Sequence, residues 1–267
     1  MTMNKTDQNT LNHICLLYPI PIPLFELASE EGINVIYDDY GRDTFDGMIW
    51  YEPGQEKFFI HINIQRGNSA TNSKGRFTLA HELGHYFIEH HRKALLNGRM
   101  QPHIHRYNPF GKNEEWQIER EADEFAAQLL MPTTKFYDDV KHTVLSGDLI
   151  QRLAVKYQVS FSACALRYMK MNLVPIMLVY AEAGKIKWQM KSEDFPFRRL
   201  RYGTDKVPEN SVMGDYFYRG DSSYCKQSEL VNASDCFYTF TENDNRLQFY
   251  EYCIPFGKYA LSMFWQK

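Results

Sequence analysis

The chain has 267 residues, of which 44% are hydrophobic and 15% aromatic, and its formal net charge at pH 7 is -3. This length and composition exclude a disordered or fibrous protein and allow one large core or two smaller ones. The nearly balanced charge argues against a surface that binds nucleic acids generally.

Cysteine usage and hydropathy indicate the compartment. The five cysteines are odd in number, widely scattered and never arranged as C-x-x-C, so neither a disulfide framework nor a cysteine-based zinc site is indicated. We recognise no secretory signal, and no run approaches the roughly 18 apolar residues that a membrane helix needs. We therefore expect a cytoplasmic protein without a membrane partner.

The first part of the chain predicts a tail followed by short elements. We expect a flexible tail over residues 1–18 and a first domain over 19–140. "PLFELASEEG" predicts a short helix that ends at Gly32, and "INVIYDD" predicts a strand. In "DGMIWYEPGQEKFFIHINI", two apolar runs flank Pro53 and Gly54, which suit the central positions of a type II turn. This segment therefore predicts a β-hairpin.

Two helices and a long irregular stretch come next. "RFTLAHELGHYFI" predicts an apolar helix, whereas residues 89–113 are rich in His, Arg, Pro, Gly and Asn and predict a long excursion with little regular structure. A second helix is predicted from about Glu114 to Met131, because its apolar residues recur with the helical period and Pro132 ends it.

The remaining sequence predicts a helical segment and a β-rich domain. Residues 141–172 contain two predicted helices joined by a turn around Val159 and Ser160, which resembles a helix-turn-helix. Beyond them we expect a β-rich α/β domain over 173–267, built from the short strands "IMLVY", "KIKWQM", "CFYTFT", "RLQFYEYCI" and "YALSMFW". The expected fold class is α+β.

His81, Glu82 and His85 form a polar cluster on the apolar helix. Residues four apart on an α-helix lie within about 40° of each other, so both imidazoles can aim at one point. H-E-x-x-H in this geometry is the zincin arrangement, in which two neutral histidines bind Zn²⁺ and the glutamate deprotonates a metal-bound water. Chance produces the pattern in about one chain in a hundred of this length. Here, however, the neighbours are apolar, and a metal would offset the cost of burying three polar groups.

A catalytic zinc needs a third protein ligand. His91 lies six residues after His85, as in metzincins, but that pattern needs a glycine where Ile88 stands. On a continuing helix His91 would point about 240° away from His85, so we discount it. The second predicted helix offers Glu119 on the edge of its apolar face and Glu115 on its inward face.

Asp123 favours Glu119 as the third ligand. It lies one turn after Glu119, where its carboxylate can accept the spare imidazole N–H of a ligand histidine and fix the orientation of that ring. Glu121 lies about 100° from the centre of the apolar face, on its far edge. One helix face would therefore supply both a ligand and the residue that orients another ligand.

The pair "RFTLAHELGH" and "EREADEFAAQLLMP" closely resembles the ImmA/IrrE family of metallo-endopeptidases, over roughly residues 24–135. The resemblance implies a gluzincin-like peptidase domain with a small antiparallel sheet, the H-E-x-x-H helix and a second ligand helix. It also implies roles for individual residues: zinc binding by His81, His85 and Glu119, general-base catalysis by Glu82, and Asp123 where the family often has Asn or Asp.

The same resemblance implies a substrate and a partner. Family members typically cleave a helix-turn-helix repressor of the XRE type and so derepress stress-response or mobile-element genes. Some relatives carry their own repressor-like domain at the N-terminus; we expect a separate repressor here. Relatives can also carry a sensor-like domain after the peptidase domain, which implies a sensory or regulatory role for 173–267.

Other signals leave alternatives open. Tyr86, His103, His105 and Tyr107 are candidate donors to the developing oxyanion, and the sequence does not choose among them. The strand "KFFIHINI" is a candidate edge on which substrate could add, or simply a core strand. The alternative function is a non-catalytic regulator that binds DNA or protein. It would use basic residues of the helix-turn-helix-like segment, although two packed helices explain that segment more simply: Arg152, Lys156, Arg167 and Lys170.

Overall fold

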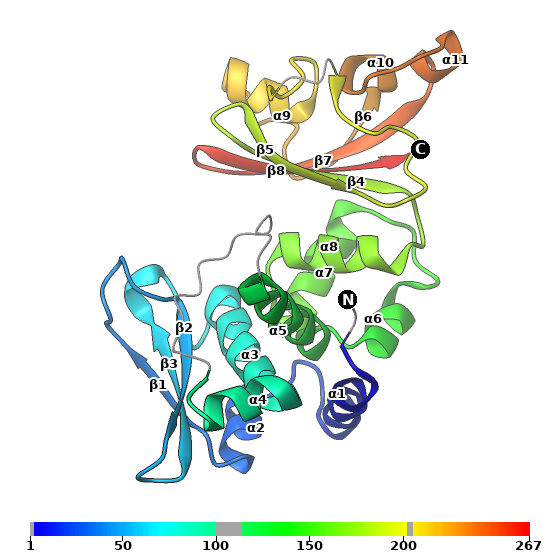
Figure 1. Cartoon of the computed structure of the whole chain (residues 1–267). Coiled ribbons are helices and arrows are strands. Elements are labelled where there is room, and N and C mark those ends of the chain that lie inside the picture. The colour runs from blue at the N-terminus through cyan, green and yellow to red at the C-terminus, as the bar shows by residue number, and fades with distance from the viewer. Residues whose placement is uncertain (1–2, 100–113, 202–204) are drawn as a thin grey trace. The chain divides into compact units, whose positions relative to one another are not determined.

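The structure is a computed structural model, and it describes residues 3–99, 114–201 and 205–267. The fold is mixed α+β, as expected, and the chain divides into two compact units (Figure 1). Unit 1 comprises Met1–Phe136 and Ala154–Ser160, and unit 2 comprises Tyr137–Leu153 and Phe161–Lys267.

Unit 1 begins with a helix, α1 (Lys5–Leu17), where the sequence predicts a flexible tail. Asn4 caps it by accepting a hydrogen bond from the backbone N–H of Asp7 at 2.9 Å. Leu11 and Ile14, three residues apart, are buried and give the helix one apolar stripe. The tail prediction is therefore wrong from Lys5 onward, because this stripe packs into the core of unit 1.

The next elements are α2 (Leu24–Glu30) and a three-stranded sheet made of β1 (Asn34–Asp38), β2 (Gly47–Glu52) and β3 (Lys57–Asn63). The strand order is β1-β3-β2, with β1 parallel and β2 antiparallel to β3. The sheet is thus mixed, where a purely antiparallel one was expected. The candidate edge strand "KFFIHINI" is β3, which lies in the centre, so the edges are β1 and β2.

The predicted hairpin forms between β2 and β3, but its turn differs from the predicted type II turn. The residue with positive φ is Glu56, at 53°, and Gly54 has no positive φ. The backbone N–H of Gln55 donates to the carbonyl of Glu52 at 3.1 Å. The positive φ therefore falls immediately before β3 and not at the glycine.

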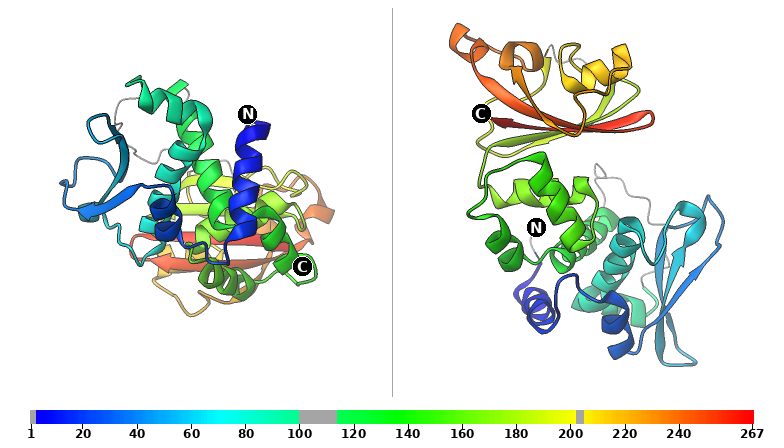
Figure 2. Two further views of the ribbon diagram at one scale, coloured as in Figure 1. Left: turned by 90° about the horizontal axis from the view of Figure 1, so that it is seen from below. Right: turned by 180° about the vertical axis from the view of Figure 1, so that it is seen from behind.

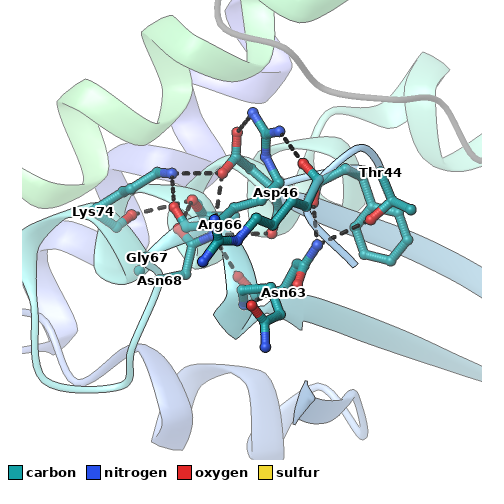
Figure 3. A network of polar contacts seen from close by, with 12 residues as sticks. Thr44, Asp46, Asn63, Arg66, Gly67, Asn68 and Lys74 are labelled. Atoms are coloured by element: carbon teal, nitrogen blue, oxygen red, sulfur yellow. Dashed lines mark hydrogen bonds and ion pairs between the residues drawn. The ribbon is translucent and has the colours of Figure 1, made fainter. Parts of the chain in front are cut away.

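A buried polar network holds the connection from the sheet to the next helix (Figure 3). Asp46 is 6% exposed, and its carboxylate forms ion pairs with Arg66 at 3.1 Å and Lys74 at 2.7 Å. The Asn68 side chain donates to the Asp46 carboxylate and to the carbonyl of Asn63, and its oxygen accepts from the Thr78 hydroxyl at 3.0 Å. The start of β2 is thereby tied to the helix that follows, through the short 3-10 turn η1 (Ile64–Arg66).

Three helices follow: α3 (Ser73–Phe87), α4 (Glu89–Leu96) and α5 (Glu114–Leu130). Helices α3 and α5 are the two predicted ligand helices, and Pro132 follows α5 as predicted. The irregular excursion predicted over 89–113 is wrong over α4, and residues 100–113 lie outside the described part of the chain.

Helices α3 and α5 pack closely because α3 has a glycine at the crossing. A Cβ on Gly84 would lie 3.2 Å from the Ala122 carbonyl oxygen and 3.3 Å from the Phe125 Cβ. One turn further along, the Phe87 and Phe125 rings stack at 5.9 Å between centroids. The close approach brings the polar residues of both helices within reach of each other.

The helical segment that follows contains α6 (Thr133–Val140), α7 (Gly147–Tyr157) and α8 (Phe161–Met171). The predicted pair of helices around Val159 and Ser160 is confirmed as α7 and α8. Arg167 on α8 is only 5% exposed, so it cannot contact a DNA phosphate in this conformation.

Unit 2 is built on a five-stranded antiparallel sheet in the order β5-β4-β8-β7-β6. Its strands are β4 (Ile176–Glu182), β5 (Lys185–Lys191), β6 (Ser228–Asn232), β7 (Gln248–Phe256) and β8 (Tyr259–Gln266). The predicted strand "CFYTFT" is wrong: it begins in α10 (Ala233–Cys236), and β6 precedes it.

Short helices cover one face of this sheet. Figures 1 and 2 show α9 (Val212–Gly214) and α10 on the same face, and η3 (Asp215–Arg219) and α11 (Glu242–Asn245) complete the unit. The core beneath them is aromatic, with Phe237 packed against the rings of Phe197 and Phe249. Helix α8 contacts β4, and its Phe161 ring stacks on Tyr252.

One carboxylate lies in this core. Glu251 on β7 is fully buried and accepts hydrogen bonds from the backbone N–H groups of Val212 and Met213 at 2.7 and 3.1 Å, and from the Ser262 hydroxyl at 2.5 Å. Burial raises the pKa of Glu251 to about 7, against the opposing effect of these three donors.

Within the described ranges, no helix is long and apolar enough to cross a membrane.

Asp46→Asn should destabilise the protein by about 1–3 kcal/mol, because it leaves a buried polar site that no longer balances Arg66 and Lys74. Burial alone would raise the pKa of Asp46, but Arg66, Lys74 and Asn68 together hold it below its usual range. The ionised form is therefore favoured on folding, and its contribution is lost as the pH falls through that depressed pKa. Thermal unfolding at neutral pH measures the effect. Asp38→Asn, which removes the same charge from an exposed position, is the control, and equal melting temperatures for the two variants would refute the role of the network.

Glu251→Gln should remove a pH dependence of stability. Because the folded pKa of about 7 exceeds the unfolded value of about 4.3, the folded state binds more protons between these limits, and stability falls as the pH rises across them. As the pH rises from 5 to 8, the melting temperature of Glu251→Gln should therefore rise relative to that of the parent. The melting temperature of Glu209→Gln, a variant at an exposed position, should not. Parallel profiles for the parent and Glu251→Gln would contradict this account.

Candidate metal centre

His81 and His85 lie one turn apart on α3 and are almost completely buried, at 1% and 0% exposure. Their Nε2 atoms are 3.0 Å apart, so both rings aim at the same point. The helix places them there because residues four apart share a face.

Glu119 on α5 completes the group. Its two carboxylate oxygens lie 3.3 Å from His81 Nε2 and 3.4 Å from His85 Nε2. Tetrahedral zinc ligands about 2.0–2.1 Å from the ion are about 3.3–3.4 Å from each other, so the observed separations are close to those of a zinc site. Two imidazoles and one carboxylate are also a common donor set for catalytic zinc. The described residues therefore fit this ion.

Asp123 lies beside the other nitrogen of His81. Its Oδ1 is 2.9 Å from His81 Nδ1, which leaves His81 Nε2 directed at the group. Burial alone would lower the pKa of His81, but Asp123, Glu119 and Glu82 outweigh it and raise the pKa to about 10. The site therefore attracts positive charge, which a proton or a divalent cation can supply.

Glu82 lies on α3 next to the start of β2. It is 2% exposed, and a Cβ on Gly47 would lie 2.6 Å from its Oε1 atom and 2.5 Å from the Thr78 methyl group. Gly47 therefore leaves the space that the Glu82 carboxylate occupies. The polar network around Asp46, the preceding residue, fixes this part of β2.

His91 contacts the second ring nitrogen of His85, a contact that the sequence patterns do not predict. His85 Nδ1 and His91 Nδ1 are 3.2 Å apart, and His91 is 1% exposed. The chain does not continue as one helix here: Ile88 has φ −73° and ψ 115°, so α3 ends and α4 turns back. No glycine is required, because this is ordinary extended backbone.

Glu121 lies on the far side of His91. Its Oε2 is 3.3 Å from His91 Nε2 and 2.9 Å from His90 Nε2. His90, His91 and Glu121 thus form a second group of potential ligands beside the group of His81, His85 and Glu119. Burial and the neighbouring His85 and His90 lower the pKa of His91 to about 2, so His91 is neutral at pH 7.

Of the four candidate oxyanion donors, Tyr86 is the one in the described part of the chain, and its hydroxyl has another partner. The Tyr86 hydroxyl donates to Glu31 at 3.0 Å, a partner outside the group. His103, His105 and Tyr107 lie outside the described residues, as do the side-chain surroundings of Glu115. His61, on β3, contacts the Tyr40 hydroxyl at 2.6 Å and has no place in the group.

Comparisons with known proteins identify the family of the chain. Residues 28–169, just over half of the chain, match the model of the Peptidase_M78 family, the IrrE N-terminal-like domain. Among solved structures, a Mycobacterium tuberculosis transcriptional regulator is similar in fold, with a TM-score of 0.60 and 14% identity, over 99% of this chain and 77% of that one. No curated protein matches the chain by sequence. The match to the family model over these residues shows that the chain belongs to the Peptidase_M78 family, named for the IrrE N-terminal-like domain.

Proposed function

We propose that this protein is a zinc-dependent endopeptidase that hydrolyses a peptide bond in a regulatory protein. The observation that carries the proposal is the convergence of His81 Nε2, His85 Nε2 and the Glu119 carboxylate at tetrahedral spacing, with Glu82 on the same helix. A protein that only binds a partner has no need of the general base Glu82. The domain would then have the zincin arrangement, with one ligand helix in α3 and the other in α5.

In this proposal His81, His85 and Glu119 hold the zinc, and Asp123 orients His81 through its Nδ1–H. When bound, zinc supplies Lewis-acid chemistry: it polarises a peptide carbonyl and lowers the pKa of a water molecule towards neutrality. Glu82 accepts the proton of the attacking water and passes it to the leaving amine. His103, His105 and Tyr107 remain candidate donors to the oxyanion, whereas the Tyr86 hydroxyl already serves Glu31.

The substrate would add as an extended strand along β2. Strand β2 is an edge of its sheet, and it begins at Gly47, in contact with Glu82. Main-chain pairing with an edge strand is a recurring mode of peptide recognition. A peptide held there would run past the general base Glu82. Strand β3 cannot pair with a peptide in this way, because it lies in the centre of the sheet.

The substrate class would be an XRE-type helix-turn-helix repressor whose cleavage relieves transcriptional repression. Family membership supports a protein substrate, and the structural neighbour is named a transcriptional regulator. The five cysteines are all free thiols, which suits a reducing cytoplasm where such a repressor would work. Residues 173–267 would serve as the sensory or regulatory part.

A second candidate is a regulator without catalysis, which would bind DNA through α7 and α8. The name of the structural neighbour favours it. The burial of Arg167 opposes it, because one of the four basic residues in question is then unavailable. Gel shifts of the chain on DNA, with and without a chelator, separate the two candidate functions. Tight DNA binding that is unchanged by the chelator supports the regulator.

Glu82→Gln should retain zinc and lose proteolysis by about 10²–10⁴-fold, because the amide cannot accept the proton. His85→Ala should lose both zinc and activity. Zinc content by elemental analysis and cleavage of the repressor encoded nearest to this chain are the two measurements. Cleavage by Glu82→Gln at the parent rate would remove this residue from the mechanism.

Gly47→Ala should slow cleavage by at least about tenfold with zinc content unchanged, because its new methyl group displaces the Glu82 carboxylate and small misplacements of a catalytic group are costly. Gly54→Ala is the matched control, since its Cβ would meet nothing closer than 3.4 Å. If the Gly47 and Gly54 variants cleave equally well, the contact between β2 and Glu82 does not matter for catalysis.

A further inference from the structure

We infer that His91 and Glu121 form a positioning pair, which keeps the proton of His85 on Nδ1 and so leaves its Nε2 lone pair for the metal. The inference rests on the proposed metal centre. Asp123 orients His81 in the same way. Each ligand histidine would therefore have its own orienting partner: the Asp123 carboxylate for His81 and the neutral His91 imidazole for His85.

The buried rings of His85 and His91 contact each other. His85 Nδ1 and His91 Nδ1 are 3.2 Å apart, and both side chains are essentially inaccessible to water. Two N–H groups cannot face each other at this distance, and two bare nitrogens would repel each other. One proton must therefore lie between the rings, on one of the two Nδ1 atoms.

The position of that proton fixes the tautomer of both rings. A neutral His85 that offers Nε2 to a metal carries its proton on Nδ1, so His91 Nδ1 must be the acceptor. His91, also neutral, then carries its own proton on Nε2, which faces the Glu121 carboxylate at 3.3 Å. This contact is long and lies outside hydrogen-bonding geometry, so it acts as an electrostatic attraction that favours the required tautomer.

Contacts at the start of α4 hold His91 in place. The backbone N–H of Glu89, in the first turn of α4, donates to the buried Asp7 carboxylate of α1 at 3.1 Å. The turn at Ile88 and this anchor fix the start of α4, two residues before His91. Helix α1 thereby contributes to the metal centre without touching it.

The same proton count decides against a second ion. A metal held by His90, His91 and Glu121 would need the His91 Nε2 lone pair, and the His91 proton would move to Nδ1. It would then oppose the Nδ1 proton of His85 across 3.2 Å. The two groups of ligands are therefore mutually exclusive, and the chain should bind one zinc ion.

Two replacements of His91 separate the acceptor from the volume of the ring. His91→Phe keeps a ring but has no acceptor, and should weaken zinc binding by about 10–100-fold. In His91→Asn the side-chain oxygen lies close to the position of Nδ1, and zinc binding should stay within about threefold of the parent. His90→Phe, the control, replaces the neighbouring histidine, which contacts Glu121 and the His91 ring. Zinc affinity and stoichiometry are measured on the full chain by competition with a chromophoric chelator, and thermal unfolding of the metal-free proteins checks folding.

We expect the parent, His90→Phe and His91→Asn to bind zinc with similar affinity. His91→Phe should bind it clearly more weakly. Equal weakening in both His91 variants would reduce His91 to a packing residue, and parent-like affinity in His91→Phe would remove it altogether. Two zinc ions per parent chain, one of them lost in His90→Phe, would overturn the proton assignment. Because these readings need no substrate, a parent that binds one zinc but cleaves nothing would contradict the proposed function and leave the pair intact.

Discussion

Two buried imidazoles of α3 face a partly exposed carboxylate of α5, and the neighbouring elements are arranged around this group. His81 and His85 are almost inaccessible, and Glu119 lies 3.3–3.4 Å from both. Polar groups removed from water are costly unless something satisfies them. A cation at their centre does so, and the carboxylates around His81 already favour positive charge there. The chemistry proposed for the chain is a consequence of that requirement.

Each neighbouring element restricts one part of this group. Gly84 lets α5 approach α3 closely enough for Glu119 to reach the histidines, and the Asp46 network holds the start of β2 against Glu82. Helix α1 holds α4, which carries His91 to the back of His85. Residues distant in sequence thus act on two ring nitrogens, which is how proteins commonly orient metal ligands.

The sequence predicted the parts of this site that depend on local periodicity. The spacing of His81 and His85, and the apolar period that placed Glu119 and Asp123 on one face, needed only helical geometry. His91 escaped prediction because its direction was judged as if the helix continued past Ile88, although irregular structure was predicted from residue 89; the extended backbone at Ile88 turns the chain instead. Helix α1 had a readable signal, an Asn4 cap and a Leu11–Ile14 stripe, but most of its other residues are polar. The turn at Glu56 and the strand β6 depend on pairing that propensity does not specify.

All of the chemistry proposed for this chain requires one ion held by side chains from two helices. X-ray absorption at the zinc edge of the purified, zinc-loaded chain tests it most directly, because it reports the atoms around the ion. We predict nitrogen and oxygen neighbours at about 2.0–2.1 Å, including two imidazoles, without sulfur, and no such shell in His85→Ala, which should not retain zinc. A shell containing sulfur, or one that is unchanged in His85→Ala and in Glu119→Ala, would contradict it.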